Sequence, residues 1–579
     1  MLRSQHIRGI NRQADGLRMG VGWDDADLAK PQIVIESVYG DSHPGSAHLD
    51  GLVEAASLGA HLAGGKPARH YCTDICDGIA QAHDGMNYSL ASRDLIAGMV
   101  ELHAQANAYD ALVCISSCDK AIPAHLMAMA RVNLPAIHVP GGGQATGPDL
   151  LSSEMLYAYG DQMDRGALTS DELAMLTRNA CPSCGACHFM GTASTGQVIA
   201  EALGLALPGS ALVPATLNHL RAGARGAGTQ IVELVRRGGP LPRDILSREA
   251  FENAVMVHAA IGGSTNFLLH LPAIAREVGQ ALEPDLWDAI GRKVPVLANV
   301  KTSGKYSSEQ FWYAGGVPAI MLELRELLHL DCPTVTGRTV GENLEHVRKT
   351  GFLTETRRYL NNYQLKWRDV IYPLTKPFRP SGAIAVLRGN LAPGGAVTKQ
   401  SAVPREMWVH TGPARPFDSE EEAIAALLAA GDAAHDGIHP GDVVIIRNEG
   451  PRGSGMPEMM RCTDLIAANP TLAKTTALVT DGRFSGATKG PAVGHVSPEA
   501  AAGGPLALVE RGDLVRIDLP GRRLDLVGLA GQERDADAIA AALAERRARW
   551  QPPAPRYTRG MLALYCQRAA PAMEGAYLI

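Results

Sequence analysis

The sequence contains no long apolar run, few aromatic residues and little net charge. Its longest apolar runs, such as residues 425–430, are far shorter than the roughly 20 residues that cross a bilayer. Aromatic residues make up only 5% of the chain, and the formal net charge is −6 over 579 residues, with no basic stripe. We therefore expect neither a membrane nor a nucleic acid as a partner.

The first residues also lack the apolar core of a secretory signal peptide. This absence predicts a cytoplasmic protein, because a secreted chain needs such a leader. In the reducing cytoplasm, the ten cysteines are expected to be free thiols or metal ligands rather than disulfides.

The length and the changing pattern predict two domains. A chain of 579 residues is too long for one ordinary hydrophobic core. Residues 111–143 form a predicted strand–helix–strand unit, which is typical of a parallel sheet with crossover helices. After the proline-rich segment 372–382, short β-rich runs alternate with Gly/Pro turns. We predict a parallel-sheet α/β domain over 1–375 and a β-barrel-type domain over 376–579.

Other segments complete the expected organisation. A strand that begins near residue 32 leads into a predicted helix over 47–63, while residues 1–30 are polar and predict an irregular arm. The last twenty residues are expected to pack as an arm on a neighbour. Apolar periodicity predicts further helices over 171–179, 193–204, 250–260, 265–278 and 420–430.

The segment CPSCGAC, residues 181–187, packs three cysteines into seven residues. The spacing is compatible with zinc, with an iron–sulfur cluster, with a redox pair or with buried thiols. A structural zinc site needs four ligands, and no CxxC pair elsewhere in the chain completes one. The segment is therefore a poor self-contained zinc site, and the other interpretations stay open.

Two Cys-Asp pairs lie at the edges of predicted loops. Asp77 follows Cys76, and Asp119 follows Cys118 after a predicted buried strand. A soft thiolate beside a hard carboxylate suits two metals side by side, iron on sulfur and Mg²⁺ on oxygen. Each aspartate also has an ordinary structural explanation, a turn for Asp77 and a helix N-cap for Asp119. Because the pair occurs twice, we favour a site with chemistry.

Seven long motifs run from about residue 30 to about 510 and include CDGIAQAHDGM, SCDK, GACHFMGTAST, NEGPRGSGMPEM and TDGRFSGATKG. In sequence and in order they resemble the dihydroxy-acid/phosphogluconate dehydratase family. The resemblance implies a hydro-lyase with an α/β N-terminal domain, a β-barrel C-terminal domain, and an iron–sulfur cluster and Mg²⁺ between them. It also implies a cytoplasmic homodimer or homotetramer that binds a small-molecule substrate.

The family's site residues carry over onto matching positions. Cys118 and Cys187 resemble cluster ligands. Ser485 of GRFSG matches the family's catalytic base, and a serine can act as a base only where nearby metal charge stabilises its alkoxide. The Mg²⁺ ligands implied by the resemblance are Asp77, Asp119, Glu449 and Lys120. Lys120 is carbamylated in family members, and an oxygen of the carbamate binds the metal and so takes part in catalysis.

The chain departs from many family members in its third cluster ligand. Those members have a cysteine in a PCN-type loop, whereas the matching stretch here, HPGSAHL, has Gly45 and Ser46. Cysteine at position 76, before Asp-Gly, resembles instead the phosphogluconate and enteric xylonate dehydratase branches. We therefore expect the third ligand at Cys76, and we favour a [2Fe–2S] cluster over a [4Fe–4S] cluster.

The expected reaction is loss of water from a 2,3-dihydroxy acid, which gives a 2-keto-3-deoxy acid. The combination of Gly45 and Cys76 favours a sugar acid (an aldonate such as xylonate, arabinonate or gluconate) as the substrate. Two alternatives stay open. One is dihydroxy-acid dehydratase of branched-chain amino-acid biosynthesis, and the other is a non-catalytic metal-binding protein.

Overall fold

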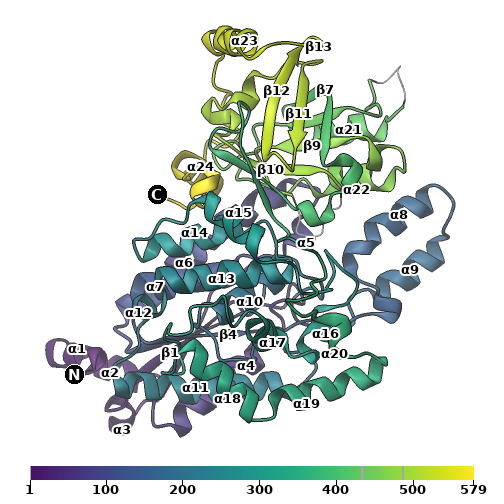
Figure 1. Ribbon diagram of the computed structural model, residues 1–579. Helices are drawn as coiled ribbons and strands as arrows, with labels where there is room; N and C mark the ends of the chain where they lie inside the picture. The colour runs from purple at the N-terminus through teal and green to yellow at the C-terminus, as the bar shows by residue number, and fades with distance from the viewer. Residues whose placement is uncertain (1, 432–435, 485–487, 489) are drawn as a thin grey trace.

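The computed structural model of the chain describes residues 2–431, 436–484, 488 and 490–579. The predicted base Ser485 lies outside these described residues. Two sheets dominate the molecule, one formed by the N-terminal part of the chain and one by the C-terminal part, and helices surround both (Figure 1).

The first sheet consists of four parallel strands, β1 (Gln32–Ser37), β2 (Lys66–Tyr71), β3 (Ala111–Ser116) and β4 (Ala136–Pro140). Their order is β2-β1-β3-β4, so β2 is an edge strand. The central strands β1 and β3 are buried along their whole length, and their sequences QIVIES and ALVCIS are accordingly rich in β-branched residues. With α7 (Ala121–Val132), strands β3 and β4 confirm the predicted strand–helix–strand unit.

Helices cover both faces of this sheet. α4 (Leu49–Leu62) and α11 (Asn218–Arg237) pack together against one face, and α7 with α6 (Tyr88–Ala106) lies on the other. Glycines let α4 and α11 approach closely. A Cβ at Gly59 would lie 2.0 Å from the Arg225 carbonyl oxygen, and one at Gly228 would lie 2.0 Å from that of Ala56. A larger residue at either position would push the helices apart.

The second sheet consists of nine strands in the order β13-β12-β11-β7-β8-β9-β10-β6-β5. The sheet is mixed. Strands β7, β8, β9 and β10 run parallel to one another, and the other neighbouring pairs are antiparallel. The strands are β5 (Ala385–Leu387), β6 (Gly395–Thr398), β7 (Val409–Phe417), β8 (Val443–Ile446), β9 (Ala477–Thr480), β10 (Ala492–Ser497), β11 (Leu514–Asp518), β12 (Arg523–Leu529) and β13 (Gln532–Glu533).

This C-terminal sheet curls without closing, which corrects the predicted barrel to a half-barrel. Within the described part of the chain, the end of β5 meets β12 through one isolated bridge, between Arg388 and Arg523. A closed barrel needs a continuous ladder between every pair of neighbouring strands. The α/β class of the whole chain agrees with the prediction, while the division at residue 375 stays a prediction.

The remaining helices flank the sheets or fill the space between them (Figure 1). Helices predicted at 171–179, 193–204, 250–260, 265–278 and 420–430 are confirmed by α9, α10, α13, α14 and α21. The helices are α5 (Asp77–Ala80), α8 (Leu156–Asp164), α9 (Ser170–Asn179), α10 (Thr192–Ala202), α12 (Pro242–Ile245), α13 (Arg248–Ile261), α14 (Phe267–Glu277), α15 (Pro284–Lys293), α16 (Ser308–Tyr313), α17 (Gly316–Glu323), α18 (Val340–Lys349), α19 (Phe352–Arg358), α20 (Trp367–Val370), α21 (Glu420–Leu428), α22 (Met460–Ala468) and α23 (Ala536–Arg549).

The N-terminal segment differs from the predicted irregular arm. It holds three short helices, α1 (Arg3–Ile10), α2 (Gln13–Met19) and α3 (Asp25–Leu28). Their sequences lack the apolar stripe by which a helix is recognised. Accordingly, these helices bury only Ser4 and Leu28.

The C-terminal segment packs against its own chain, and its expected contact with a neighbour stays a prediction. α24 (Gly560–Arg568) lies against α6, where Leu562 and Tyr565 are buried together with Leu90. The buried guanidinium of Arg93 donates to the Ala576 carbonyl oxygen (3.0 Å), which ties the end of the chain to α6.

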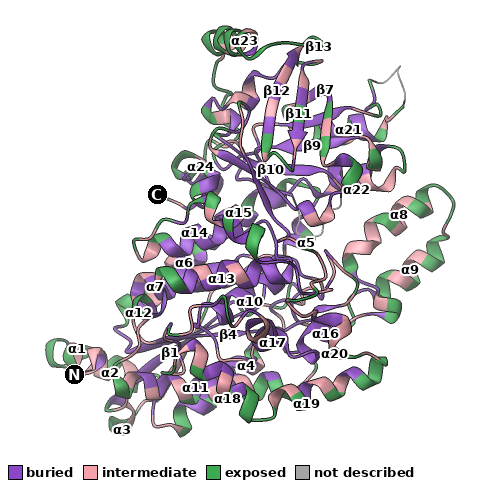
Figure 2. Cartoon of the chain, in the orientation of Figure 1, coloured by how far each residue is buried: buried purple, intermediate pink, exposed green. Residues whose placement is uncertain are grey.

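Burial is greatest in the two sheets and in the helices between them, such as α7, α10 and α13 (Figure 2). By contrast, α8 and α9 form a hairpin that buries no side chain and projects beside the rest of the molecule (Figure 2). None of the helices in the described ranges combines the length and the apolar character needed to cross a membrane.

Candidate active site

A cavity of about 320 Å³ lies between the loops that follow the parallel strands and the segment that leads into α22. The carboxyl ends of strands are the usual place for ligands in sheets of this kind. The predicted cluster ligands and two of the predicted Mg²⁺ ligands line this one cavity. Its polar and sulfur-containing side chains are Cys76, Asp77, Gln81, Cys118, Asp119, Gln144, Ser153, Glu154, Tyr157, Cys181, Cys187, Thr192, Ser194, Glu458 and Met460.

The thiols of Cys76 and Cys118 lie within hydrogen-bonding distance of each other inside the cavity. Cys76 precedes the short helix α5, and Cys118 precedes α7 in the loop after β3. Their hydrogen bond lowers the pKa of the Cys76 thiol and raises that of Cys118, because it stabilises a thiolate on Cys76 at the expense of one on Cys118. The two sulfurs therefore act as a pair.

The segment 181–187 contributes two of its three sulfurs to the cavity. Cys187, at the approach to α10, lines the cavity beside Ser194, whose hydroxyl donates to the Cys187 carbonyl oxygen (2.9 Å). Cys181 also lines it but is exposed, whereas Cys184 does not. Burial raises the pKa of both Cys187 and Cys181.

Asp77 and Lys120 form a buried ion pair beside the thiols. The Lys120 Nζ lies 2.5 Å from the Asp77 Oδ2, which also accepts a hydrogen bond from the Ser89 hydroxyl (2.9 Å). Burial alone would raise the pKa of Asp77, but the charges of Lys120 and Arg483 outweigh it and hold that pKa below the ordinary value. The second carboxylate oxygen, Oδ1, is buried with no hydrogen-bond partner among the described residues.

Asp119 is a carboxylate with a different environment. Its helix, α7, begins after Lys120 without any side-chain cap, so the N-cap explanation for Asp119 does not apply. Burial and the nearby charge of Asp77 raise the pKa of Asp119 to about 8. The side chain lies 3.8 Å from the Lys120 Nζ. Since Lys120 already pairs closely with Asp77, negative charge is in excess at this end of the cavity.

Glu458 brings a carboxylate into the cavity from the C-terminal part of the chain. Its Oε1 accepts hydrogen bonds from Asn266 (2.6 Å) and Arg483 (3.2 Å), and its Oε2 accepts one from Gln81 (2.8 Å). Sequence reasoning missed this residue, although it lies in the quoted motif NEGPRGSGMPEM. The signal available was the second glutamate of that motif, which the sequence alone does not rank against Glu449.

Glu449, the glutamate expected to bind Mg²⁺, does not line the cavity. Its carboxylate accepts a hydrogen bond from the Ser454 hydroxyl and forms an ion pair with Arg556 at 3.3 Å. Burial raises the pKa of Glu449 to about 7. The structure therefore places this side chain in a separate network.

The segment that carries Ser485 is described only as far as Phe484. Arg483 is fully buried and contacts both sides of the cavity, through Glu458 and through the Ser89 hydroxyl (3.2 Å). The backbone of Arg483 also forms an isolated bridge with Glu458. The described end of this motif is thus adjacent to the cavity wall, and the role of Ser485 stays a prediction.

The donor set suits the two cofactors implied by the family resemblance. Three thiols offer soft ligands for iron, while the carboxylates of Asp77 and Asp119 offer hard oxygen ligands for Mg²⁺. The unpartnered Oδ1 of Asp77 and the raised pKa of Asp119 both mark a place where a cation would be stabilising. The residues therefore fit an iron–sulfur cluster next to Mg²⁺.

Comparison with known protein families agrees with the fold and with the residues that line the cavity. The chain matches the N-terminal model of the dihydroxy-acid/6-phosphogluconate dehydratases over residues 30–343 and their C-terminal model over residues 369–576. It belongs to this family. The chain is accordingly an enzyme of the hydro-lyase class, a dehydratase that acts on a small-molecule substrate, and the family implies an iron–sulfur cluster and Mg²⁺.

Similar proteins cover the whole chain. One from Acetivibrio thermocellus is 43% identical over 586 residues, which span 100% of both chains. One from Syntrophobacter fumaroxidans is 44% identical over 568 residues, 96% of this chain and 95% of the relative. One from Caldanaerobacter subterraneus is 42% identical over 584 residues, 99% of each. All three are named dihydroxy-acid dehydratase. These relatives therefore favour the alternative prediction, dihydroxy-acid dehydratase, over the expected sugar-acid dehydratase.

Proposed function

We propose that this enzyme is a dihydroxy-acid dehydratase, which converts a 2,3-dihydroxy carboxylic acid into the 2-keto acid and water. The observation that carries the proposal is a single cavity in which the thiols of Cys76, Cys118 and Cys187 lie beside the carboxylates of Asp77, Asp119 and Glu458. Relatives of the same length, more than 40% identical, bear this name. The substrate expected first is therefore the branched-chain dihydroxy acid.

The proposed cluster ligands are Cys76, Cys118 and Cys187. The proposed Mg²⁺ ligands are Asp77, Asp119, carbamylated Lys120 and Glu458, with Glu458 taking the place that sequence reasoning gave to Glu449. When bound, the two cofactors would supply Lewis acidity at the substrate's carboxylate and hydroxyl groups. Held by these three cysteines rather than by four protein ligands, a cluster would be able to act as a Lewis acid on the substrate's 3-hydroxyl group.

The protein's own groups have three tasks in the reaction. The cavity walls bury Cys118, Asp77 and Glu458, and burial strengthens the electrostatic interactions among them. Gln81, Asn266 and Arg483 fix the Glu458 carboxylate in one orientation, so its position costs no reorganisation during the reaction. The C2 proton passes to the base, the C3–O bond breaks, and the departing hydroxide takes up that proton and leaves as water. The resulting enol tautomerises to the 2-keto acid. Ser485 is the proposed acceptor of the C2 proton.

A sugar acid is the second candidate substrate, and one structural observation favours it. A Cβ added at Gly45 would lie 3.0 Å from the Cys118 sulfur, so position 45 faces the cluster site although it carries no thiol. Cys76 instead pairs with Cys118. This replacement is the feature that resembles the sugar-acid branches.

A substrate panel tests the proposal. Purified enzyme with Mg²⁺ would be assayed for 2-keto acid formation from 2,3-dihydroxyisovalerate, xylonate, arabinonate and gluconate. We expect a kcat/KM for the branched acid that is at least about tenfold higher than for any aldonate. The opposite preference would establish the sugar-acid function, and no keto acid from any of them would reject both.

A further inference from the structure

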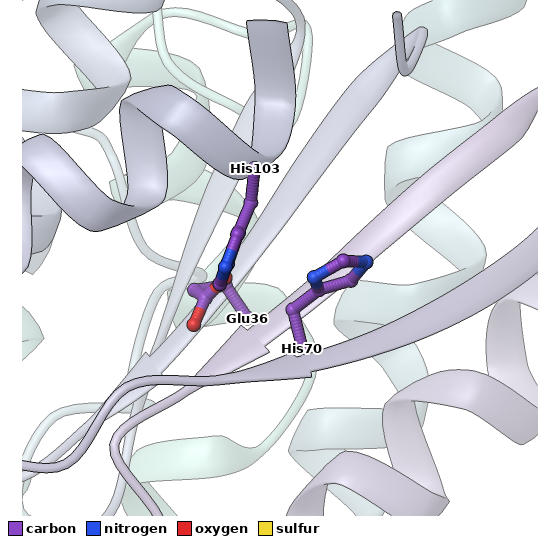
Figure 3. Close-up of side chains that lie close together, drawn as sticks. All are labelled: Glu36, His70 and His103. Carbon is purple, nitrogen blue, oxygen red and sulfur yellow. The ribbon is translucent and has the colours of Figure 1, made fainter. Parts of the chain in front are cut away.

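A second group of metal-ligating side chains lies outside the cavity, on the face of the four-stranded sheet that α6 covers. It consists of Glu36 on β1, His70 on β2 and His103 on α6 (Figure 3). One ligand atom from each lies within 4.8 Å of the other two. Among the described residues, no other set of three histidine, cysteine or acidic side chains meets this spacing.

The backbone register brings two of these side chains together. Glu36 and His70 are direct partners in the β1–β2 pair, so their side chains project from the same face of the sheet. His103 reaches them from the last turn of α6, and its Nδ1 lies 3.0 Å from the Glu36 Oε2. Figure 3 shows His103 descending from its helix onto Glu36, with a ring nitrogen of His70 turned toward the pair.

Neighbouring side chains hold the three ligands as the surroundings of a metal site do. The Nε2 of His70 lies 3.0 Å from the Tyr109 hydroxyl, a contact that fixes the ring and leaves Nδ1 toward Glu36 and His103. The Cys72 thiol donates to the other oxygen of Glu36, Oε1 (3.2 Å). Glu36 and His70 are thereby each oriented by a partner outside the set.

The charge balance of the group also calls for a cation. The Glu36 carboxylate is fully buried, and within the described residues its only basic ion-pair partner is His103. A buried carboxylate without a strong cationic partner is costly. The His103 side chain is 23% exposed, which provides a path for an ion to enter from solvent.

We propose that Glu36, His70 and His103 bind a divalent transition metal of the zinc class. Two imidazoles and one carboxylate, with a position left for water, are a preferred ligand set for Zn²⁺. The metal would join β2, the edge strand of its sheet, to β1 and α6. Because the segment after β2 carries Cys76 and Asp77, this site would brace one wall of the cavity from behind. The proposal does not rest on the identity of the substrate.

Metal counting on the intact enzyme tests it. Protein that carries its own iron would be dialysed against micromolar Zn²⁺ in excess Mg²⁺, and zinc and iron would be counted per chain. The variants are His70→Gln, His103→Gln and His103→Cys, which keeps a ligand. The control is His329→Ala, which breaks a comparable His–Glu pair, His329 with Glu252 at 2.9 Å, that has no third ligand.

We expect wild type, His329→Ala and His103→Cys to hold one equivalent of zinc more than the two glutamine variants, with the same iron content in all. The affinity in the glutamine variants should fall by about tenfold or more. X-ray absorption at the zinc edge should show imidazole scattering. Equal zinc in wild type and both glutamine variants, or a zinc edge without imidazole, would overturn the proposal.

Discussion

The two sides of the cavity are built in different ways. The N-terminal side supplies the proposed ligands Cys76, Cys118, Cys187, Asp77 and Asp119 from short motifs that lie near the start of a helix or after a strand. The C-terminal side supplies one carboxylate, Glu458, which three side chains from separate parts of the chain hold in place. The proposed sulfur ligands are thus positioned by their own short segments of the chain. The proposed oxygen ligand Glu458 is positioned by hydrogen bonds from residues far away in the sequence.

Besides the direct hydrogen bonds from Gln81 and Asn266 to Glu458, the Arg483 side chain connects the two sides. The Arg483 guanidinium contacts Glu458 on the C-terminal side and Ser89 on the other, and the Ser89 hydroxyl donates to Asp77. A buried network of this kind is rigid only while each member keeps its partner. Removing a ligand and removing a positioning residue should therefore have effects of different size.

The largest effect is expected on the thiol side. Cys76→Ser, Cys118→Ser and Cys187→Ser should each reduce iron and acid-labile sulfide to background and lower kcat/KM roughly a thousandfold, because the Lewis acid is lost. Metal analysis and the keto-acid assay on the same samples check this. Cys184→Ser is the matched control, since Cys184 belongs to the same segment but does not line the cavity. Full iron in Cys76→Ser would move the third ligand elsewhere, with Cys181 the next candidate.

A smaller effect is expected for the oxygen ligand, and it separates the two glutamates of one motif. Glu458→Gln should lower kcat/KM by roughly 100-fold and raise the Mg²⁺ concentration needed for half-maximal activity, because a metal oxygen is lost. Glu449→Gln should leave the Mg²⁺ dependence unchanged, since Glu449 contacts Ser454 and Arg556 instead. Titration of activity with Mg²⁺ distinguishes them, and the reverse ranking would restore Glu449 as the ligand.

The smallest effect is expected for a positioning residue. Asn266→Ala removes one hydrogen bond to Glu458 and should raise the Mg²⁺ requirement by about tenfold without loss of iron. Asn253→Ala provides the comparison, because Asn253 is equally buried but bonds to the His329 carbonyl oxygen. If both variants shifted the Mg²⁺ requirement alike, the effect would reflect stability and not the position of Glu458.

Much of the thiol side could be predicted from the sequence. The pattern of residues 111–143 gave a strand, a loop and a helix, and Cys118 and Asp119 do lie at the end of that strand. Such local patterns are legible because side-chain period and turn chemistry act over a few residues. The doubled Cys-Asp pair pointed to Cys76 and Asp77, and the family motifs singled out Cys187; all three line the cavity.

The other side could not be predicted in the same way. Glu449 and Glu458 are nine positions apart in one loop-rich motif, and what separates them is a set of distant partners, such as Arg556 for Glu449 and Asn266 for Glu458. The open edge of the C-terminal sheet has the same origin, because pairing between β5 and β12 joins segments more than a hundred residues apart. The cluster of Glu36, His70 and His103 likewise depends on strand register.

The central claim is that the cavity holds an iron–sulfur cluster and Mg²⁺ and performs a dehydration. The most direct test is one anaerobic preparation of the wild-type enzyme, analysed for iron and acid-labile sulfide and assayed with 2,3-dihydroxyisovalerate with and without Mg²⁺. The account predicts iron and sulfide in equal amounts and Mg²⁺-dependent release of the 2-keto acid. A preparation that contains no iron, or that retains full activity without any divalent cation, would contradict it.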